Sequence, residues 1–305
     1  MSLTAFIGAM ELGLVYSLLA FGTFISFRIL KVADLTVDGS FVLGAAASAM
    51  LTFEGMPFAG ILAALTAGAI AGVITALLQT KMGIQPILAG ILTMTGLYSI
   101  NLRIMMGKAN LPLLNQESIF TDKNILLMLC IITFICAAFF TLLFKTKLGY
   151  LLKGIGDNEN MITSLGINTG SIKIFALSLS NAFIALSGGI LAQYQGFSDI
   201  NMGTGTMIMG LASIIIGYNI FRKINLSNSS IFCIIGTLLY RTSIALSLRF
   251  GFNPSDLNLI SSIIVIIALS IGNSRELLAN RRRYSLGKEK FKYLLGLKKA
   301  GSRNA

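Results

Sequence analysis

Two polar stretches interrupt an otherwise apolar chain and hold most of its residues that could bind a charged or polar ligand. They cover residues 33–44 and 198–210, and each leads into a short apolar run. The ligand-binding candidates in the two stretches are Asp34, Thr36, Asp38, Gly39, Asp199, Asn201 and Gly203. Because a carboxylate buried in a membrane without a partner is costly, we expect Asp34 and Asp38 to face water, a cation or a substrate.

The two stretches resemble each other. Each reads as a small residue, Asp, an aliphatic residue, Thr or Asn and a second aliphatic residue, followed by Gly and hydroxyl residues. If the similarity marks a repeat rather than chance, the two halves are offset by five apolar runs, and an odd offset makes them inverted. Inverted halves with Gly-interrupted helices form many transporter sites near the bilayer midplane. The alternative is that Asp34 and Asp38 lie in a hydrated loop and pair with Arg28 or Lys31.

Glu11 is a third acidic candidate, because it lies within the first apolar run, where a carboxylate facing lipid is unfavourable. A carboxylate at this position is explained if it faces a groove or a subunit interface, or if it is protonated. It is also explained if the helix is tilted and Glu11 lies near the outer surface. The candidate translocation pathway therefore consists of Glu11, Asp34, Thr36, Asp38, Gly39, Asp199, Asn201 and Gly203.

The sequence lacks the residues that several kinds of chemistry need. It has no His, which excludes His-based metal sites, proton relays and catalytic dyads. Its three cysteines lie in apolar runs, where a thiol behaves as a small hydrophobe. No phosphate-binding loop ending in Gly-Lys-Ser or Gly-Lys-Thr occurs. We therefore expect no catalytic residue, no metal and no cofactor bound by this chain.

The elements that must position the candidates are membrane-spanning helices. Of 305 residues, 55% are hydrophobic and 12% are charged, a balance too apolar for a soluble domain. The apolar runs are residues 3–27, 40–53, 58–80, 87–106, 125–144, 171–194, 206–221, 230–248 and 257–271. The predicted fold is an all-α polytopic transmembrane helical bundle of about nine spans, with a range of about eight to ten. The range exists because residues 28–39 form either a cytoplasmic loop or an unwound segment inside the membrane.

Small residues predict close helix packing in the third run, where Ala64, Gly68 and Gly72 recur at four-residue spacing. Basic residues predict the orientation, with the N-terminus outside and the C-terminus in the cytoplasm. Residues 275–305 hold ten Lys or Arg against two Glu, which suits an anionic lipid surface. Nucleic acid is not the expected partner, since this tail has few stacking aromatics and no fold of its own. We expect a membrane domain at 1–274 and a basic cytoplasmic tail at 275–305.

The longest polar interruption is residues 145–169, which we expect to be cytoplasmic. Leu, Ile and Met are spaced along it as on two short amphipathic helices, and Gly156 and Asp157 are expected to form the turn between them. An amphipathic segment of this kind either contacts a partner protein or lies on lipid headgroups.

Residues 145–169 resemble the cytoplasmic coupling loop of permeases in ABC importers of the branched-chain amino acid, ribose and basic membrane lipoprotein-dependent class. The resemblance rests on Thr146, Leu148-Gly149, Gly156-Asp157-Asn158, Met161 and Leu165-Gly166-Ile167-Asn168. It extends to residues 27–41 and 196–203, which look like a subgroup whose substrates are poorly assigned, some being linked to aromatic amino acids. One departure is Lys153-Gly154, where the subgroup usually has Arg-Ala, so the loop helix is expected to be weaker.

The resemblance implies a membrane-spanning permease of an ATP-driven importer for a small organic solute, amino acids first, in the bacterial inner membrane. It implies a second permease copy, two cytoplasmic ATP-binding subunits that hydrolyse ATP, and an external substrate-binding lipoprotein. The ATPase-coupling residues would be Leu148, Gly149, Leu152, Gly156, Asp157, Asn158, Met161, Leu165 and Gly166. The alternative function is an ion-coupled secondary transporter or channel, in which Glu11, Asp34 and Asp38 bind the coupling ion.

Overall fold

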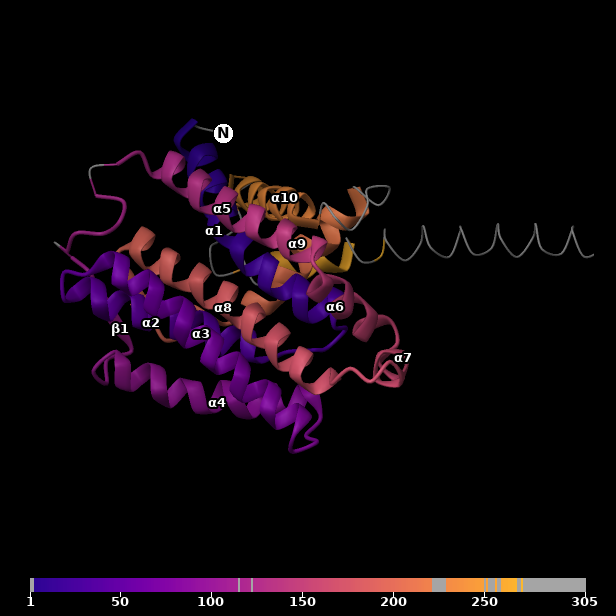
Figure 1. The fold of residues 1–305 in the computed structure, drawn as a ribbon. Coiled ribbons are helices and arrows are strands. Elements are labelled where there is room, and N and C mark those ends of the chain that lie inside the picture. The colour runs from indigo at the N-terminus through magenta and orange to yellow at the C-terminus, as the bar shows by residue number, and fades with distance from the viewer. Residues whose placement is uncertain are drawn as a thin grey trace, which may run out of the picture.

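The computed structural model is a bundle of helices with a short two-stranded ribbon (Figure 1). It describes residues 3–114, 116–121, 123–220, 229–249, 251, 256, 259–267 and 270. The elements are α1 (Leu3–Thr23), the π-helix η1 (Phe24–Ile29), α2 (Thr36–Phe53), α3 (Pro57–Thr80), α4 (Pro86–Ile104), β1 (Asn110–Pro112), α5 (Ile125–Lys145), α6 (Lys147–Asp157), α7 (Glu159–Ser164), α8 (Thr169–Gln195), β2 (Phe197–Asp199), α9 (Thr206–Ile220) and α10 (Ser229–Arg249). This arrangement confirms the all-α polytopic bundle.

Seven of the described helical segments are long and apolar enough to cross a membrane. They are α1 with η1, α2, α3, α4, α5, α8 and α10. The seventh predicted run is α9, a shorter apolar helix of 15 residues. The ninth, residues 257–271, lies partly outside the described residues.

Helix α8 lies at the centre of the bundle and packs against α1, α2 and α3 (Figure 1). Glycines bring α2 and α8 together, because a side chain at Gly44 would collide with the Ala185 carbonyl and one at Gly188 with the Phe41 carbonyl. The small-residue face predicted for α3 is confirmed: Ala64, Gly68 and Gly72 are all buried, and the two glycines contact the backbone of α8.

The two short helices that follow the polar stretches run in opposite directions. Asn181 of α8 is hydrogen-bonded to Asp34 just before α2, and Gln193 near the end of α8 is hydrogen-bonded to Ser48 near the end of α2, so α2 and α8 are parallel. Helix α9 is antiparallel to α10, and α10 is antiparallel to α1, so α9 and α1 run in the same direction. Helix α1 is in turn antiparallel to α8. Helix α9 therefore runs opposite to α2, as inverted halves require.

The first polar stretch is held inside the bundle. In η1 the backbone widens, with the Leu30 N–H donating to the Ile25 carbonyl at 2.9 Å. The chain then emerges at the exposed Lys31 and returns inward, so that Asp34 is fully buried and α2 begins at Thr36. The second part of residues 28–39 is therefore an unwound segment inside the bundle, which is one of the two alternatives that the sequence left open.

The two ends of the bundle carry different connections (Figure 1). At one end β1 pairs with β2 in antiparallel register, which ties the α4–α5 connection to the α8–α9 connection. At the other end lie α6 and α7 (Figure 1). The basic tail at 275–305 lies outside the described residues.

Candidate functional site

The two polar stretches meet at one side chain, Asp38 in the first turn of α2. Its carboxylate accepts hydrogen bonds from the Thr206 hydroxyl at 2.8 Å, the Met207 N–H at 2.9 Å and the Gly205 N–H at 3.1 Å. These donors form the start of α9, whose first N–H groups have no partner within the helix. A carboxylate at this end also interacts favourably with the helix dipole. Asp38 therefore joins the first half of the chain to the start of α9.

Close backbone contact reinforces this junction. A side chain at Gly203 would collide with the Asp38 carbonyl, so only glycine allows the second stretch to approach α2. Gly205 has a φ of +79°, a left-handed conformation that favours glycine and turns the chain into α9. The glycines seen in the sequence are thus required by the way in which the two stretches pack.

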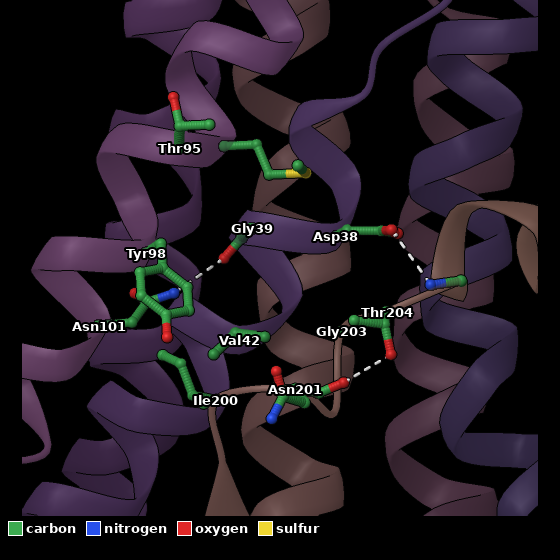
Figure 2. Close-up of a pocket in the computed structure, with 12 residues that line it drawn as sticks. Asp38, Gly39, Val42, Thr95, Tyr98, Asn101, Ile200, Asn201, Gly203 and Thr204 are labelled. Carbon is green, nitrogen blue, oxygen red and sulfur yellow. Dashed lines mark hydrogen bonds between the residues drawn. The ribbon is translucent and has the colours of Figure 1, made fainter. Parts of the chain in front are cut away.

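A cavity of about 390 Å³ lies beside this junction, between α2, α4 and the chain that leads into α9. It is lined by Asp38, Gly39, Val42, Met94, Thr95, Tyr98, Asn101, Ile200, Asn201, Gly203, Thr204 and Gly205. Figure 2 shows Tyr98 and Asn101 facing α2, while the Asp38 carboxylate points away from them and toward α9. The buried Asn101 amide donates to the Gly39 carbonyl at 3.3 Å, which fixes α4 against α2.

A smaller cavity of about 230 Å³ lies next to the first one. Its lining includes Ile208 and Met209 of α9 and Ser261 and Ser262 of the helical residues 259–267. Thr204 and Gly205 line both cavities. The turn that Asp38 holds is therefore a wall between the two spaces.

Four of the candidate pathway residues line the larger cavity, namely Asp38, Gly39, Asn201 and Gly203. The sequence did not single out Met94, Thr95 and Tyr98 of the lining, because they look like ordinary residues of a spanning helix. A signal existed in the Thr, Tyr and Asn of α4, which recur at positions 95, 98 and 101 and so share one helix face.

Asp34 and Thr36 lie inside the protein instead. The fully buried Asp34 carboxylate accepts from the Thr36 N–H and from the Asn181 amide, both at 2.9 Å. These protein donors take the place of the water, cation or substrate that the sequence led us to expect. The Thr36 and Thr75 hydroxyls are hydrogen-bonded at 2.9 Å, which fixes the start of α2 against α3.

The two remaining candidates lie elsewhere in the bundle. The Glu11 carboxylate accepts from the Tyr194 hydroxyl at 2.8 Å, so α1 is bonded to the end of α8. Asp199 lies on β2, where it accepts from the Asn201 N–H at 2.8 Å and from the Asn110 amide at 3.2 Å. Asp199 therefore shapes the turn that brings Asn201 to the larger cavity.

Helices α6 and α7 have one face on the bundle and one face exposed. Leu152, Ile155 and Ile162 are buried. A side chain at Gly156 would collide with the Ile29 carbonyl, so α6 packs directly on the end of η1. The exposed apolar residues Leu148, Tyr150, Met161 and Leu165 form what we call the α6–α7 surface. Exposed apolar residues gathered in this way are typical of a surface that contacts a partner protein or a lipid surface.

The turn between α6 and α7 is one or two residues later than expected. Gly156 and Asp157 still belong to α6, whereas Asn158 has extended backbone angles and accepts from the Met161 N–H at 3.1 Å. Asn158 forms the break because its side chain caps α7. Gly149 packs on the backbone of Phe144, and Gly166 has a φ of +78° after α7.

Two ion pairs hold these short helices. Lys31 contacts Asp157 at 2.9 Å with both side chains exposed, and Lys173 contacts Glu159 at 2.7 Å. The hydrogen bond from Lys173 lowers the pKa of the Glu159 carboxyl below its ordinary value. The first pair joins α6 to the chain that leads from η1 to Asp34.

A family model described as the permease component of the branched-chain amino acid transport system matches residues 6–270. The chain therefore belongs to this family, and it is a permease of an ABC-type importer and a multi-pass protein of the bacterial inner membrane. Because the chain belongs to this family, the importer permease is the function retained, in place of the ion-coupled secondary transporter or channel.

The relatives carry different names. The chain is 43% identical to a tyrosine transport system permease protein of Clostridioides difficile over 89% of its own length and 92% of the relative's. It is 40% identical to an uncharacterized protein of Rickettsia prowazekii over 87% of its own length and 96% of the relative's. An autoinducer 2 import system permease protein of Yersinia pestis is 33% identical over 52% of this chain and 46% of its own length. No solved structure gives a significant match to the chain.

Proposed function

We propose that this permease imports an amino acid and that the solute passes through the cavities on either side of the Thr204–Gly205 turn. The observation that carries this proposal is the contact of Asp38 with the start of α9, because it joins two interrupted helices beside both cavities. An interrupted helix offers polar groups to a solute at membrane depth. The tyrosine transport relative, which aligns over most of both chains, supports an amino acid as the solute.

The α6–α7 surface is where an ATP-binding subunit would dock in this proposal. It offers Leu148, Met161 and Leu165 to a partner, while Leu152 and Gly156 on the other face fix α6 to the bundle. A displacement of α6 would act first on η1, which it contacts at Ile29.

Residues 29–38 would transmit that displacement to the cavities. The segment contacts α6 at Ile29 and Lys31, α8 at Asp34, and α9 at Asp38. It therefore touches the docking region at one end and the cavity wall at the other. If this segment couples the two regions, one change of state must alter both the docking region and the cavity wall. A transport assay can test this requirement.

The proposed assembly has two copies of the permease, two cytoplasmic ATP-binding subunits that hydrolyse ATP, and a substrate-binding lipoprotein outside. The permease itself contributes the path and no nucleotide chemistry. Its basic tail is proposed to contact the anionic cytoplasmic leaflet.

The proposal is tested with the assembled complex in liposomes. ATP inside and loaded binding protein outside should give uptake of labelled L-tyrosine, while labelled ribose offered with the same binding protein should not accumulate. Uptake of the sugar without any amino acid would contradict the proposed substrate class. Uptake without added ATP would contradict the proposed energy source.

A further inference from the structure

Arg241 is a cation in the middle of α10, and the functions described above do not use it. Its guanidinium lies 3.7 Å from the centre of the Tyr16 ring of α1, and its Nη2 lies 3.7 Å from the Met209 sulfur of α9. A charged side chain at membrane depth is costly and generally faces a polar partner or the path of a solute. The position of Arg241 between three helices therefore needs a physical reason.

The contacts of Arg241 do not satisfy its charge. A guanidinium has five N–H donors, but a thioether is a weak acceptor and an aromatic face accepts no strong hydrogen bond. The Arg241 Nε is buried without a hydrogen-bond partner. In the part of the chain that the structure describes, the ion pairs are Lys31–Asp157 and Lys173–Glu159, so no carboxylate neutralises Arg241 there.

The surroundings of Arg241 connect it to the proposed path. Met209, whose sulfur it contacts, lines the smaller cavity, and this cavity shares Thr204 and Gly205 with the larger one. The acidic group at the start of α9 is Asp38, whose carboxylate already accepts three hydrogen bonds there, from Gly205, Thr206 and Met207. Arg241 thus lies directly behind Met209, a wall residue of the smaller cavity, and a rotation of this flexible side chain would expose the guanidinium to an anion in the cavity.

We propose that Arg241 binds the carboxylate of the transported amino acid, with the Tyr16 ring holding the guanidinium in place. This assignment rests on the proposed function and names the residue that selects for a carboxylate. Arginine suits the role because its planar fork can donate two parallel hydrogen bonds to a carboxylate while its face stacks on an aromatic ring. Lipid phosphates offer the same charge, but they lie near the ends of a spanning helix and Arg241 lies in the middle of α10.

The test uses the assembled complex with Arg241→Gln, Arg241→Lys and the control Arg249→Gln, which removes an exposed arginine from the end of the same helix. Saturation-transfer NMR on the nucleotide-free complex reports weak binding of L-tyrosine and of tyramine, which is the same molecule without its carboxylate. We expect Arg241→Gln to weaken tyrosine binding about tenfold or more, because a hydrogen bond to a charged group is lost. Tyramine binding should be weak and the same in all forms.

Arg241→Lys should retain part of the tyrosine binding, and Arg249→Gln should retain all of it. Stimulation of ATP hydrolysis by loaded binding protein should persist in Arg241→Gln, which shows that the complex is folded and assembled. Equal tyrosine binding by wild type and Arg241→Gln would overturn the assignment, and so would an equal loss of tyrosine and tyramine binding, which indicates a structural or lipid role. Uptake by the wild-type complex reports separately on the proposed function: if it imports no amino acid, both proposals are wrong.

Discussion

Asp34 and Asp38 belong to one short stretch of chain, yet their surroundings differ. Asp34 is fully buried, and both of its oxygens accept from groups of the protein. Asp38 is half-buried at a cavity and holds the start of a helix from the other half of the chain. The first carboxylate fixes the bundle, whereas the second joins two parts that a transport cycle would have to move. The comparison shows that the roles of two acidic residues in one membrane segment are distinguished by their hydrogen-bond partners and not by the local sequence.

The largest expected effect is that of Asp34→Ala on stability. The substitution leaves the Thr36 N–H buried without its Asp34 acceptor and removes one of the two acceptors of the Asn181 amide, which keeps the Leu177 carbonyl. An unsatisfied buried donor costs about 1–3 kcal/mol, and the lost hydrogen bond from Asn181 to a charged group adds to this cost. The purified permease should melt at a clearly lower temperature, measured by its intrinsic fluorescence. Asp34→Asn should be milder, since Asn181 has an unpaired carbonyl oxygen that can accept from the new amide. Equal melting of wild type and Asp34→Ala would remove the structural role.

Asp38→Asn should instead affect transport more than stability. The amide keeps the shape but loses the charge that faces the start of α9, an interaction of about 0.5–2 kcal/mol. Uptake in liposomes should fall severalfold while the melting temperature changes little. Asp199→Asn is the control, because it removes a carboxylate from the second stretch outside the lining of either cavity, and its amide oxygen can still accept from the Asn201 N–H that shapes the turn. A large loss of stability in Asp38→Asn would make the two carboxylates equivalent and contradict the comparison.

Gly156→Ala tests whether α6 acts on this stretch. The added methyl group would collide with the Ile29 carbonyl and shift α6 away from η1. We expect the complex to assemble and bind loaded binding protein, but stimulation of ATP hydrolysis should fall severalfold because the contact between α6 and residues 29–38 is disturbed. Gly154→Ala is the control in the same helix, because the added methyl group meets only the end of the flexible Ile162 side chain and no backbone. Normal stimulation in Gly156→Ala would show that the contact is dispensable.

The smallest expected effect belongs to Glu159, whose ion pair with Lys173 lies outside the stretch. Since the pKa of the Glu159 carboxyl is lowered in the folded protein, the pair stabilises the fold at neutral pH, and this contribution is lost as the pH falls through the lowered pKa. The half-exposed pair is worth less than about 1 kcal/mol. Wild type should therefore melt slightly above Glu159→Gln at pH 7, and the difference should disappear on acidification, once the pH is below the lowered pKa of Glu159. A difference that grows on acidification would reverse the assigned shift.

The sequence was sufficient for the helical bundle and the small-residue face of α3, and it singled out the two polar stretches that meet in the structure. Apolar runs and glycine spacing are local signals, so they can be read without the fold. It was not sufficient to separate Asp34 from Asp38, because their partners Asn181 and Thr206 are far away in the chain. Arg241 was missed for the same reason, because it is recognised only from its contacts with Tyr16 and Met209 of two other helices.

The loop at 145–169 shows a second limit. Its amphipathic pattern predicted two short helices, and the structure has them as α6 and α7. The turn was assigned to Gly156 because glycine often marks turns. In the structure Gly156 is needed for packing on Ile29 inside α6, and a cap by Asn158 makes the break. A glycine required for close approach and a glycine required for a turn look alike in sequence.

The central claim is that the solute passes the wall that Asp38 holds between the two cavities. It is tested most directly by modifying a single thiol at Thr204→Cys, which lines both cavities, in a chain whose cysteines at 130, 136 and 233 are replaced by alanine. A bulky water-soluble thiol reagent should react with this residue and stop ATP-driven uptake, whereas Ser180→Cys, buried between α1 and α8, should remain unmodified. Complete modification of Thr204→Cys with uptake unchanged would contradict the account.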